Sequence, residues 1–197
     1  MRIILRALFF FRKQWRLLIT RLLYVPSFKN AGKGVVIASP LHITGIRYIS
    51  IGNDVVLGYK CWLAAGHETN NPNPVLSIGN GCRIGNYNHI YATDSVVIED
   101  DVLTADKVYI SDNYHSFDCI DVPVWKQPVK HKGNVVIGEG SWLGENVCVI
   151  CANVGKHCVV GANSVVTRDI PDYSVAVGAP AKVIKQYNPE KKEWVVV

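Results

Sequence analysis

The sequence predicts an all-β solenoid, a fold in which short strands wind around one shared apolar interior. Two observations predict it: a six-residue cycle of an aliphatic residue followed by glycine, and polar insertions that interrupt this cycle without ending it. A repeat of this kind indicates the fold more strongly than local secondary-structure propensity does. The pairs that carry the cycle are Ile51-Gly52, Leu57-Gly58, Ile78-Gly79, Ile84-Gly85, Ile137-Gly138, Leu143-Gly144, Val154-Gly155 and Val160-Gly161.

A spacing of six suits neither ordinary secondary-structure element. An amphipathic helix needs apolar residues three and four apart, and an alternating strand needs them at every second position. Six suits a chain that turns after each short strand and places one aliphatic side chain per face in the interior. The glycine serves the corner, where φ is positive or the next backbone comes close. Each coil buries its face only against neighbouring coils, so several coils are required.

The rest of the chain is divided around this repeat. A degenerate first coil is expected around Ile37, Ile43 and Ile49. Two polar insertions, 64–77 and a loop over 111–134, must leave the coil, and insertions in repeat proteins often gather on the binding face. The predicted segments are an amphipathic basic helix (1–25), a connector with the first coil (26–50), the regular coils (51–170) and a C-terminal segment (171–197).

The N-terminal segment predicts an amphipathic helix, because its apolar residues recur at spacings of three and four. It lacks the roughly 18 uncharged residues of a membrane span and the cleavage site of a secretory signal. Two interpretations stay open: the helix lies in a membrane interface that carries anionic lipid, or it packs on the solenoid or a neighbouring subunit. The apolar positions are Ile4, Leu8, Phe11, Trp15, Leu18 and Leu22.

The charge is distributed unevenly along the chain. Of the 21 Lys and Arg residues, nine lie within 1–53, which holds none of the 16 Asp and Glu residues. The net charge of +5 therefore divides into +9 for that segment and −4 for the remainder. A basic arm without a recognition motif does not predict a nucleic-acid partner.

The six cysteines are interpreted as buried, reduced thiols. Cys148 and Cys151 stand in a C-V-I-C sequence, but it lies inside an apolar repeat, which favours packing over a metal site or a disulfide. Reduced thiols are typical of the cytoplasm.

Three segments are the candidates for chemistry. The first, S-D-N-Y-H-S-F-D over 111–118, stands where the repeat breaks into the long loop; the chain has no P-loop, no G-x-S-x-G and no metalloprotease motif. The second is I-G-E-G-S-W-L-G over 137–144. The third is G-A-N-S-V-V-T-R-D-I-P over 161–171, followed by V-G-A-P-A-K-V-I-K over 177–185.

Together these motifs resemble the hexapeptide-repeat acyltransferases, which fold as left-handed parallel β-helices of three-sided coils. The resemblance covers 51–185 and is nearest to the sugar acetyltransferases and the branch that acetylates bacterial surface polysaccharides. It implies acetyl-CoA as the acyl donor, a carbohydrate acceptor, no metal, and a homotrimer with each site between adjacent subunits.

The resemblance also implies site residues. Direct acyl transfer from a thioester needs a base that works near neutral pH, and His115 matches the family's D-x-x-H base. Asp112, Asn113 or Asp118 would orient it or hold the acceptor. Asn88 is either an acceptor contact or part of an asparagine ladder at a coil corner. Trp142 is expected beside the pantetheine arm and the acceptor. The remaining cofactor positions are Gly144, Gly161, Ala162, Thr167, Arg168, Lys182 and Lys185.

The resulting expectation is an acetyl-CoA-dependent O-acetyltransferase acting on a sugar hydroxyl of O-antigen, capsule or exopolysaccharide. Cytoplasmic placement at the inner face of the bacterial inner membrane would follow from residues 1–25. Three alternatives remain: N-acylation of an amino sugar nucleotide, a zinc enzyme of the carbonic-anhydrase-like branch, for which His131 is the nearest downstream partner of His115, and a non-catalytic scaffold.

Overall fold

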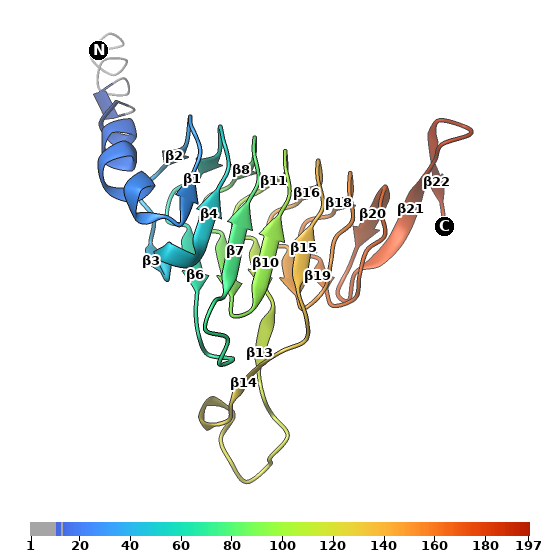
Figure 1. The fold of residues 1–197 in the computed structure, drawn as a ribbon. Coiled ribbons are helices and arrows are strands. Elements are labelled where there is room, and N and C mark those ends of the chain that lie inside the picture. Colours follow the sequence, from blue (N-terminus) through green and yellow to red (C-terminus); the bar gives the residue numbers. More distant parts are fainter. Residues whose placement is uncertain (1–10, 13) are drawn as a thin grey trace, which may run out of the picture.

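In a computed structural model that describes residues 11, 12 and 14–197, the chain forms a solenoid of parallel strands (Figure 1). Each of the first five coils contributes one short strand to each of three sheets, and the later coils continue sheets B and C, which confirms the predicted all-β solenoid. Sheet A contains β1 (Asn30–Ala31), β4 (Ile49–Ile51), β7 (Val75–Ile78), β10 (Ser95–Ile98) and β15 (Val135–Ile137).

The other two sheets repeat this arrangement, again with parallel neighbours. Sheet B contains β2 (Val36–Ile37), β5 (Val56–Leu57), β8 (Arg83–Ile84), β11 (Leu103–Thr104), β16 (Trp142–Leu143), β18 (Val159–Val160) and β20 (Ser174–Val177). Sheet C contains β3 (His42–Thr44), β6 (Trp62–Ala65), β9 (His89–Ala92), β12 (Tyr109–Ser111), β17 (Cys148–Ile150) and β19 (Val165–Val166).

The core consists of aliphatic side chains stacked in register from coil to coil. In sheet A, Ile51, Ile78, Ile98 and Ile137 follow one another in the pairing of the strands, and none is more than 3% exposed. Full burial of such a side chain stabilises the fold by roughly 1.5–3 kcal/mol. The six-residue cycle therefore lines the interior.

The glycines of the cycle are required by close approach between coils. A Cβ on Gly52 would lie 2.7 Å from the backbone nitrogen of Asn80, and one on Gly144 would lie 2.7 Å from that of Ala162. Positive φ instead occurs two positions later, at Asp54 and Asn146. Of the two roles considered for glycine, close packing is the one observed at these corners.

The first coil begins earlier than expected. β1 precedes Ile37, the first position at which a coil was expected. The reason is that Ala31-Gly32 already starts the six-residue cycle, with a side chain too small to register as an aliphatic position.

In the described part of the N-terminal helix, Trp15, Leu18 and Leu22 of the apolar stripe are exposed rather than packed on the solenoid. Residues 11, 12 and 14–19 are α-helical and continue into η1 (Thr20–Tyr24) and η2 (Val25–Ser27). No helix in the described part of the chain is long and apolar enough to cross a membrane. Ile4 and Leu8 lie outside the described residues. The exposed fractions of the others are 68% for Phe11, 63% for Trp15, 46% for Leu18 and 65% for Leu22.

The solenoid continues past the predicted end at residue 170. β20 pairs in parallel with β18, and the chain then reverses into β21 (Lys182–Asn188) and β22 (Glu193–Val196), which extend sheet B with antiparallel strands. Tyr187 and Trp194 pack edge to face across this hairpin, with ring centroids 5.6 Å apart. This hairpin gives the Trp-Val-Val-Val end of the chain a place in sheet B.

All six cysteines are free thiols, but not all are buried. Cys61, Cys82 and Cys158 lie in the interior, and burial raises the pKa of the Cys61 thiol to about 11. Cys148 and Cys151 are half-buried and Cys119 is exposed on the long loop, so the prediction of burial is wrong for these three.

Candidate active site

Three insertions leave the solenoid at the same corner, between a strand of sheet C and the next strand of sheet A. They are 45–48, which contains η3 (Ile46–Tyr48), then 66–74, and finally 112–134. The second is shorter than the predicted 64–77, because β6 and β7 extend into it. We call this corner the insertion edge. Figure 1 shows the longest insertion projecting from the solenoid there.

The long insertion starts and ends as an antiparallel ribbon. β13 (Asn113–His115) pairs with β14 (Val129–His131), placing Asn113 opposite His131 and His115 opposite Val129. Because side chains alternate across a ribbon, His115 and His131 lie on the same face. The His115 side chain is exposed, and within the described residues its imidazole makes no hydrogen bond. It is therefore accessible to an incoming group.

The far part of this loop is held by one buried amide. The Gln127 side chain donates to the carbonyls of Cys119 (2.8 Å) and Val122 (2.7 Å) and accepts from the Cys119 N–H (3.1 Å). η4 (Val124–Lys126) immediately precedes it. These bonds hold the far part of the loop together, so the segment that continues from the His115 ribbon has a defined conformation.

Asp112 supports the ribbon from beneath. Its carboxylate is fully buried and accepts hydrogen bonds from the backbone N–H groups of Thr93 (2.9 Å), Asp94 (2.7 Å) and Ser95 (2.8 Å) at the corner one coil earlier. It also accepts from the Asn113 side-chain amide (3.1 Å). These contacts argue against direct orientation of the His115 ring by Asp112 or Asn113. Asp112 acts on the base of the loop.

The Asn88 side chain likewise forms its hydrogen bonds within the solenoid. Its amide nitrogen donates to the carbonyls of Asn86 (3.2 Å) and Ala105 (2.8 Å), and its oxygen accepts from the Thr104 hydroxyl (2.8 Å). The side chain is fully buried. These bonds argue against the expected acceptor contact and favour the structural alternative.

Asp94 joins the second insertion to the ribbon, a role that the sequence did not indicate. Its carboxylate accepts from the Asn71 amide (2.6 Å) and lies 3.8 Å from Nδ1 of His131. Thr69 adds a bond from its hydroxyl to the Thr93 carbonyl (3.0 Å). The second and third insertions are therefore connected along the edge by hydrogen bonds through the corner at 93–95.

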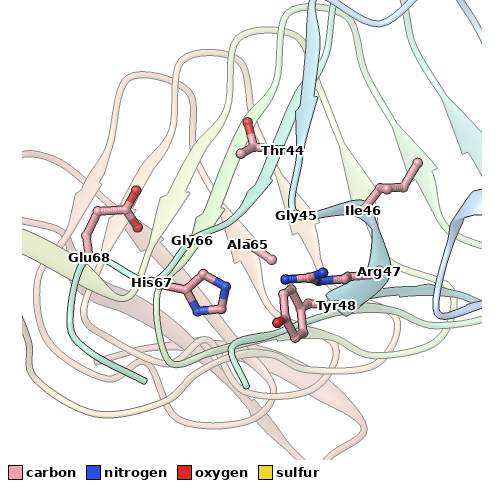
Figure 2. Close-up of a pocket in the computed structure, with 9 residues that line it drawn as sticks. All are labelled: Thr44, Gly45, Ile46, Arg47, Tyr48, Ala65, Gly66, His67 and Glu68. Atoms are coloured by element: carbon pink, nitrogen blue, oxygen red, sulfur yellow. The ribbon is translucent and has the colours of Figure 1, made fainter. Parts of the chain in front are cut away.

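A hollow of about 650 Å³ lies between the first two insertions (Figure 2). Tyr48 forms its aromatic wall: the Arg47 guanidinium lies 4.9 Å from the ring centroid, and the His67 ring meets it edge to face at 5.0 Å. Glu68, on the other side, is hydrogen-bonded to Tyr91; burial, then this bond, raises the pKa of the Tyr91 phenol. The polar insertion at 66–74 was the only sequence signal for this hollow.

A second hollow of about 730 Å³ lies on the other side of the loop. Thr167 and Arg168, two of the expected cofactor residues, line it together with Lys132. Both belong to the corner between sheets C and A, one coil beyond β17. His115 is thus flanked by hollows toward both ends of the solenoid.

The other expected cofactor residues lie away from the insertion edge. Trp142 is exposed on sheet B, and Lys182 and Lys185 lie on β21 of the same sheet. Gly144 and Gly161 stand at the corner between sheets B and C, the latter followed by Ala162. Within one chain the structure does not bring this group together with His115.

Metal-binding geometry is absent from the described residues. No three His, Cys, Asp or Glu side chains in that part of the chain are grouped as metal ligands. His131 has Asp94 as its acidic neighbour, rather than a cluster that includes His115.

A three-sheeted solenoid of hexapeptide coils, with an inserted loop that presents an accessible histidine, defines the class of solenoid acyltransferases. No protein-family model matches the chain. It is 36% identical over 167 residues, 81% of this chain and 82% of the relative, to WbbJ of Escherichia coli K12, provisionally named a lipopolysaccharide biosynthesis O-acetyl transferase. The chain belongs to the hexapeptide-repeat acetyltransferase family and is an acyltransferase.

Solved structures share the fold. A mutant of AntD, an N-acyltransferase from Bacillus cereus in complex with dTDP and coenzyme A, has a TM-score of 0.71, with 23% identity over 86% of this chain and 89% of that one. A hexapeptide-repeat acetyltransferase from Vibrio cholerae, in complex with acetyl-coenzyme A, has a TM-score of 0.57, with 22% identity over 84% and 75%. At this identity the likeness concerns the fold.

Proposed function

We propose that the protein is an acetyl-CoA-dependent O-acetyltransferase that modifies a sugar hydroxyl during bacterial surface-polysaccharide synthesis, on a left-handed β-helix. The observation that carries the proposal is His115: an accessible imidazole on a paired ribbon, with no hydrogen bond of its own in the described residues, between two hollows. The relationship to WbbJ supports the O-acetyl product and the polysaccharide acceptor.

In the proposed reaction, His115 acts as general base. Its neutral imidazole removes the hydroxyl proton as the sugar oxygen attacks the thioester carbonyl carbon. The tetrahedral oxyanion is stabilised by backbone N–H groups and then collapses. The C–S bond breaks, coenzyme A leaves as a thiolate, and the imidazolium returns the proton to sulfur. General base catalysis of this kind contributes roughly 10²–10⁴-fold in rate.

The donor site is proposed to form between subunits of a homotrimer. Trp142, Lys182 and Lys185 lie on sheet B, so a neighbouring chain must bring its sheet B toward the insertion edge if they are to meet His115. The basic side chains would bind coenzyme A phosphates, joined by Arg168 from the edge itself. The exposed apolar tip of the long loop, which includes Ile120 (97% exposed) and Trp125 (75% exposed), gives the neighbour a surface to cover.

The acceptor is proposed to extend into the hollow at the first two insertions. Tyr48 offers an aromatic face, while Arg47 and Glu68 offer a donor and an acceptor for hydroxyl groups. This lining carries both signs of charge, which suits a hydroxyl-rich ligand. The hollow lies two to three coils from the His115 corner, roughly 10–15 Å at the spacing of paired strands.

N-acylation of an amino sugar nucleotide is the second candidate. The structural likeness to AntD favours it, because that N-acyltransferase was solved with dTDP and coenzyme A. The two reactions differ in the acceptor atom, so mass spectrometry of products from hydroxyl and amino acceptors separates them.

The test of the general base is His115→Ala, with His131→Gln as the matched control from the same face of the ribbon. We expect turnover to fall about 10²–10⁴-fold in His115→Ala, with acetyl-CoA affinity unchanged, because the base contributes to chemistry rather than to donor binding. His131→Gln should stay within a few-fold of wild type. Full activity in His115→Ala would contradict the assignment.

A further inference from the structure

The N-terminal helix presents an apolar stripe that the solenoid does not cover. Trp15, Leu18 and Leu22 follow one another at spacings of three and four and are each 46–65% exposed. Thr20, by contrast, is completely buried, and its hydroxyl accepts a hydrogen bond from the Ile37 N–H of the first coil (3.2 Å). Two residues along a helix correspond to a turn of about 200°, so the stripe points away from the solenoid.

Basic side chains flank this stripe. Arg12 and Arg21 are exposed, one in the α-helical part and one in the π-helical turn η1 that continues it. No acidic residue occurs anywhere in the first 53 positions, which hold nine Lys and Arg residues. In the described part of this helix, neither arginine forms an ion pair. The surface therefore combines large apolar side chains with positive charge that the chain does not balance.

This positive charge argues against a second copy of the same helix as the partner that covers the apolar stripe. Bringing identical helices together would place like charges side by side in an interface without a compensating carboxylate from this segment. An anionic lipid surface supplies both missing components: headgroups that neutralise the arginines and an acyl boundary that accepts the apolar side chains.

We propose that the helix described over residues 11, 12 and 14–24 docks this protein on an anionic phospholipid bilayer, lying in the plane of the interface. Trp15, Leu18 and Leu22 enter the boundary between headgroups and acyl chains, while Arg12 and Arg21 bind the headgroups. The helix is joined directly to the first coil, so docking brings the N-terminal end of the solenoid to the membrane (Figure 1). The hollow containing Tyr48 lies at that end.

The test uses full-length protein and sedimentation with vesicles of pure phosphatidylcholine, or of phosphatidylcholine and phosphatidylglycerol in equal parts. Wild type should sediment with the anionic vesicles only, and less so at high salt. Trp15→Ser combined with Leu18→Ser should weaken binding at least tenfold. Arg12→Gln combined with Arg21→Gln should weaken it roughly fivefold per charge removed.

Trp194→Ser is the control, because Trp194 is an exposed tryptophan (42%) on β22, at the opposite end of the solenoid from the helix. It should bind like wild type. The proposal is overturned if wild type does not bind anionic vesicles, if the helix variants bind unchanged, or if Trp194→Ser loses binding equally. Sedimentation velocity without vesicles completes the test: a change of oligomeric state in Trp15→Ser with Leu18→Ser would assign the stripe to a subunit contact instead. Unaltered thermal unfolding of each variant excludes misfolding, and no step requires catalytic activity.

Discussion

The two regular corners of the solenoid and its insertion edge use the same kinds of residue for different purposes. At the corner between sheets A and B, Asn53, Asn80 and Asp100 form a ladder in which each backbone N–H reaches the side chain of the next coil, at 2.8 and 2.7 Å. At the insertion edge, Asp112 binds one corner in the same manner but also starts a loop that carries His115. The insertion edge is therefore a corner ladder to which the proposed functional loops are added.

The sharpest way to test this division is to separate the two halves of the proposed site. A His115→Ala protein and a Lys182→Gln, Lys185→Gln protein should each have low activity. A mixture of the two proteins, unfolded and refolded together, should regain activity by one to two orders of magnitude, because some of the proposed subunit interfaces then pair an intact edge with an intact sheet B. Turnover measured before and after mixing checks this. Absence of recovery would place the whole site in one chain.

Breaking a regular corner should damage stability. In Gly52→Val, the added side chain would overlap the backbone of Gly79 and Asn80, because even a Cβ at this position would lie 2.7 Å from the Gly79 carbonyl carbon and the Asn80 nitrogen. We expect a loss of about 3 kcal/mol in the free energy of unfolding, within the range for overpacking. Denaturant unfolding measures it. A loss below about 1 kcal/mol would contradict close packing as the reason for glycine.

Breaking the ladder at the insertion edge should damage both stability and activity. Asp112→Ala leaves the N–H groups of Thr93, Asp94 and Ser95 without their acceptor, which costs roughly 1–3 kcal/mol. Because the loop loses its base, turnover should also fall while acetyl-CoA affinity is retained. Calorimetric titration and unfolding together check this prediction. Normal turnover in a destabilised Asp112→Ala would show that the loop is positioned independently.

The smallest expected effect is a pH dependence at the regular corner. Hydrogen bonds from the Asn80 side chain and backbone lower the pKa of Asp100 below its ordinary value of 3.8. The folded state therefore favours the carboxylate, and its contribution to stability is present above about pH 4 and is lost as the pH falls through the lowered pKa. Because Asp100 is only half-buried, the effect is small. Asp100→Asn should unfold with a shallower pH dependence below pH 4; an unchanged slope would contradict the ladder's electrostatic role.

The sequence predicted the coils because their physics is local and periodic. Positions such as Ile78 and Ile84 repeat every six residues and can be recognised without knowledge of their neighbours in space. Asp112 could not be assigned correctly this way: it stands in a motif that resembles a catalytic segment, and its partner Thr93 is 19 residues earlier, one coil away. The hollow at Tyr48 and His67 could not be predicted from the sequence for the same reason, because the insertions make each coil a different length.

The ends of the solenoid were also difficult to predict. Ala31 continues the cycle with a methyl group alone, and β21 departs from the cycle altogether because it runs antiparallel. The apolar stripe of the N-terminal helix, by contrast, was predicted from the spacing of its apolar residues. Only the structure showed that Thr20, rather than the apolar stripe, faces the first coil.

The central claim, acetyl transfer to a sugar hydroxyl with His115 as base, is tested most directly by mass spectrometry of glycan acceptors incubated with acetyl-CoA and either wild type or His115→Ala. We predict that wild type adds one acetyl group, through an alkali-labile ester, to a hydroxyl-bearing acceptor, while His115→Ala binds acetyl-CoA but gives no product above background. Equal product from both proteins would contradict the role of His115, and transfer only to amino acceptors through an alkali-stable amide would contradict the O-acetyl assignment.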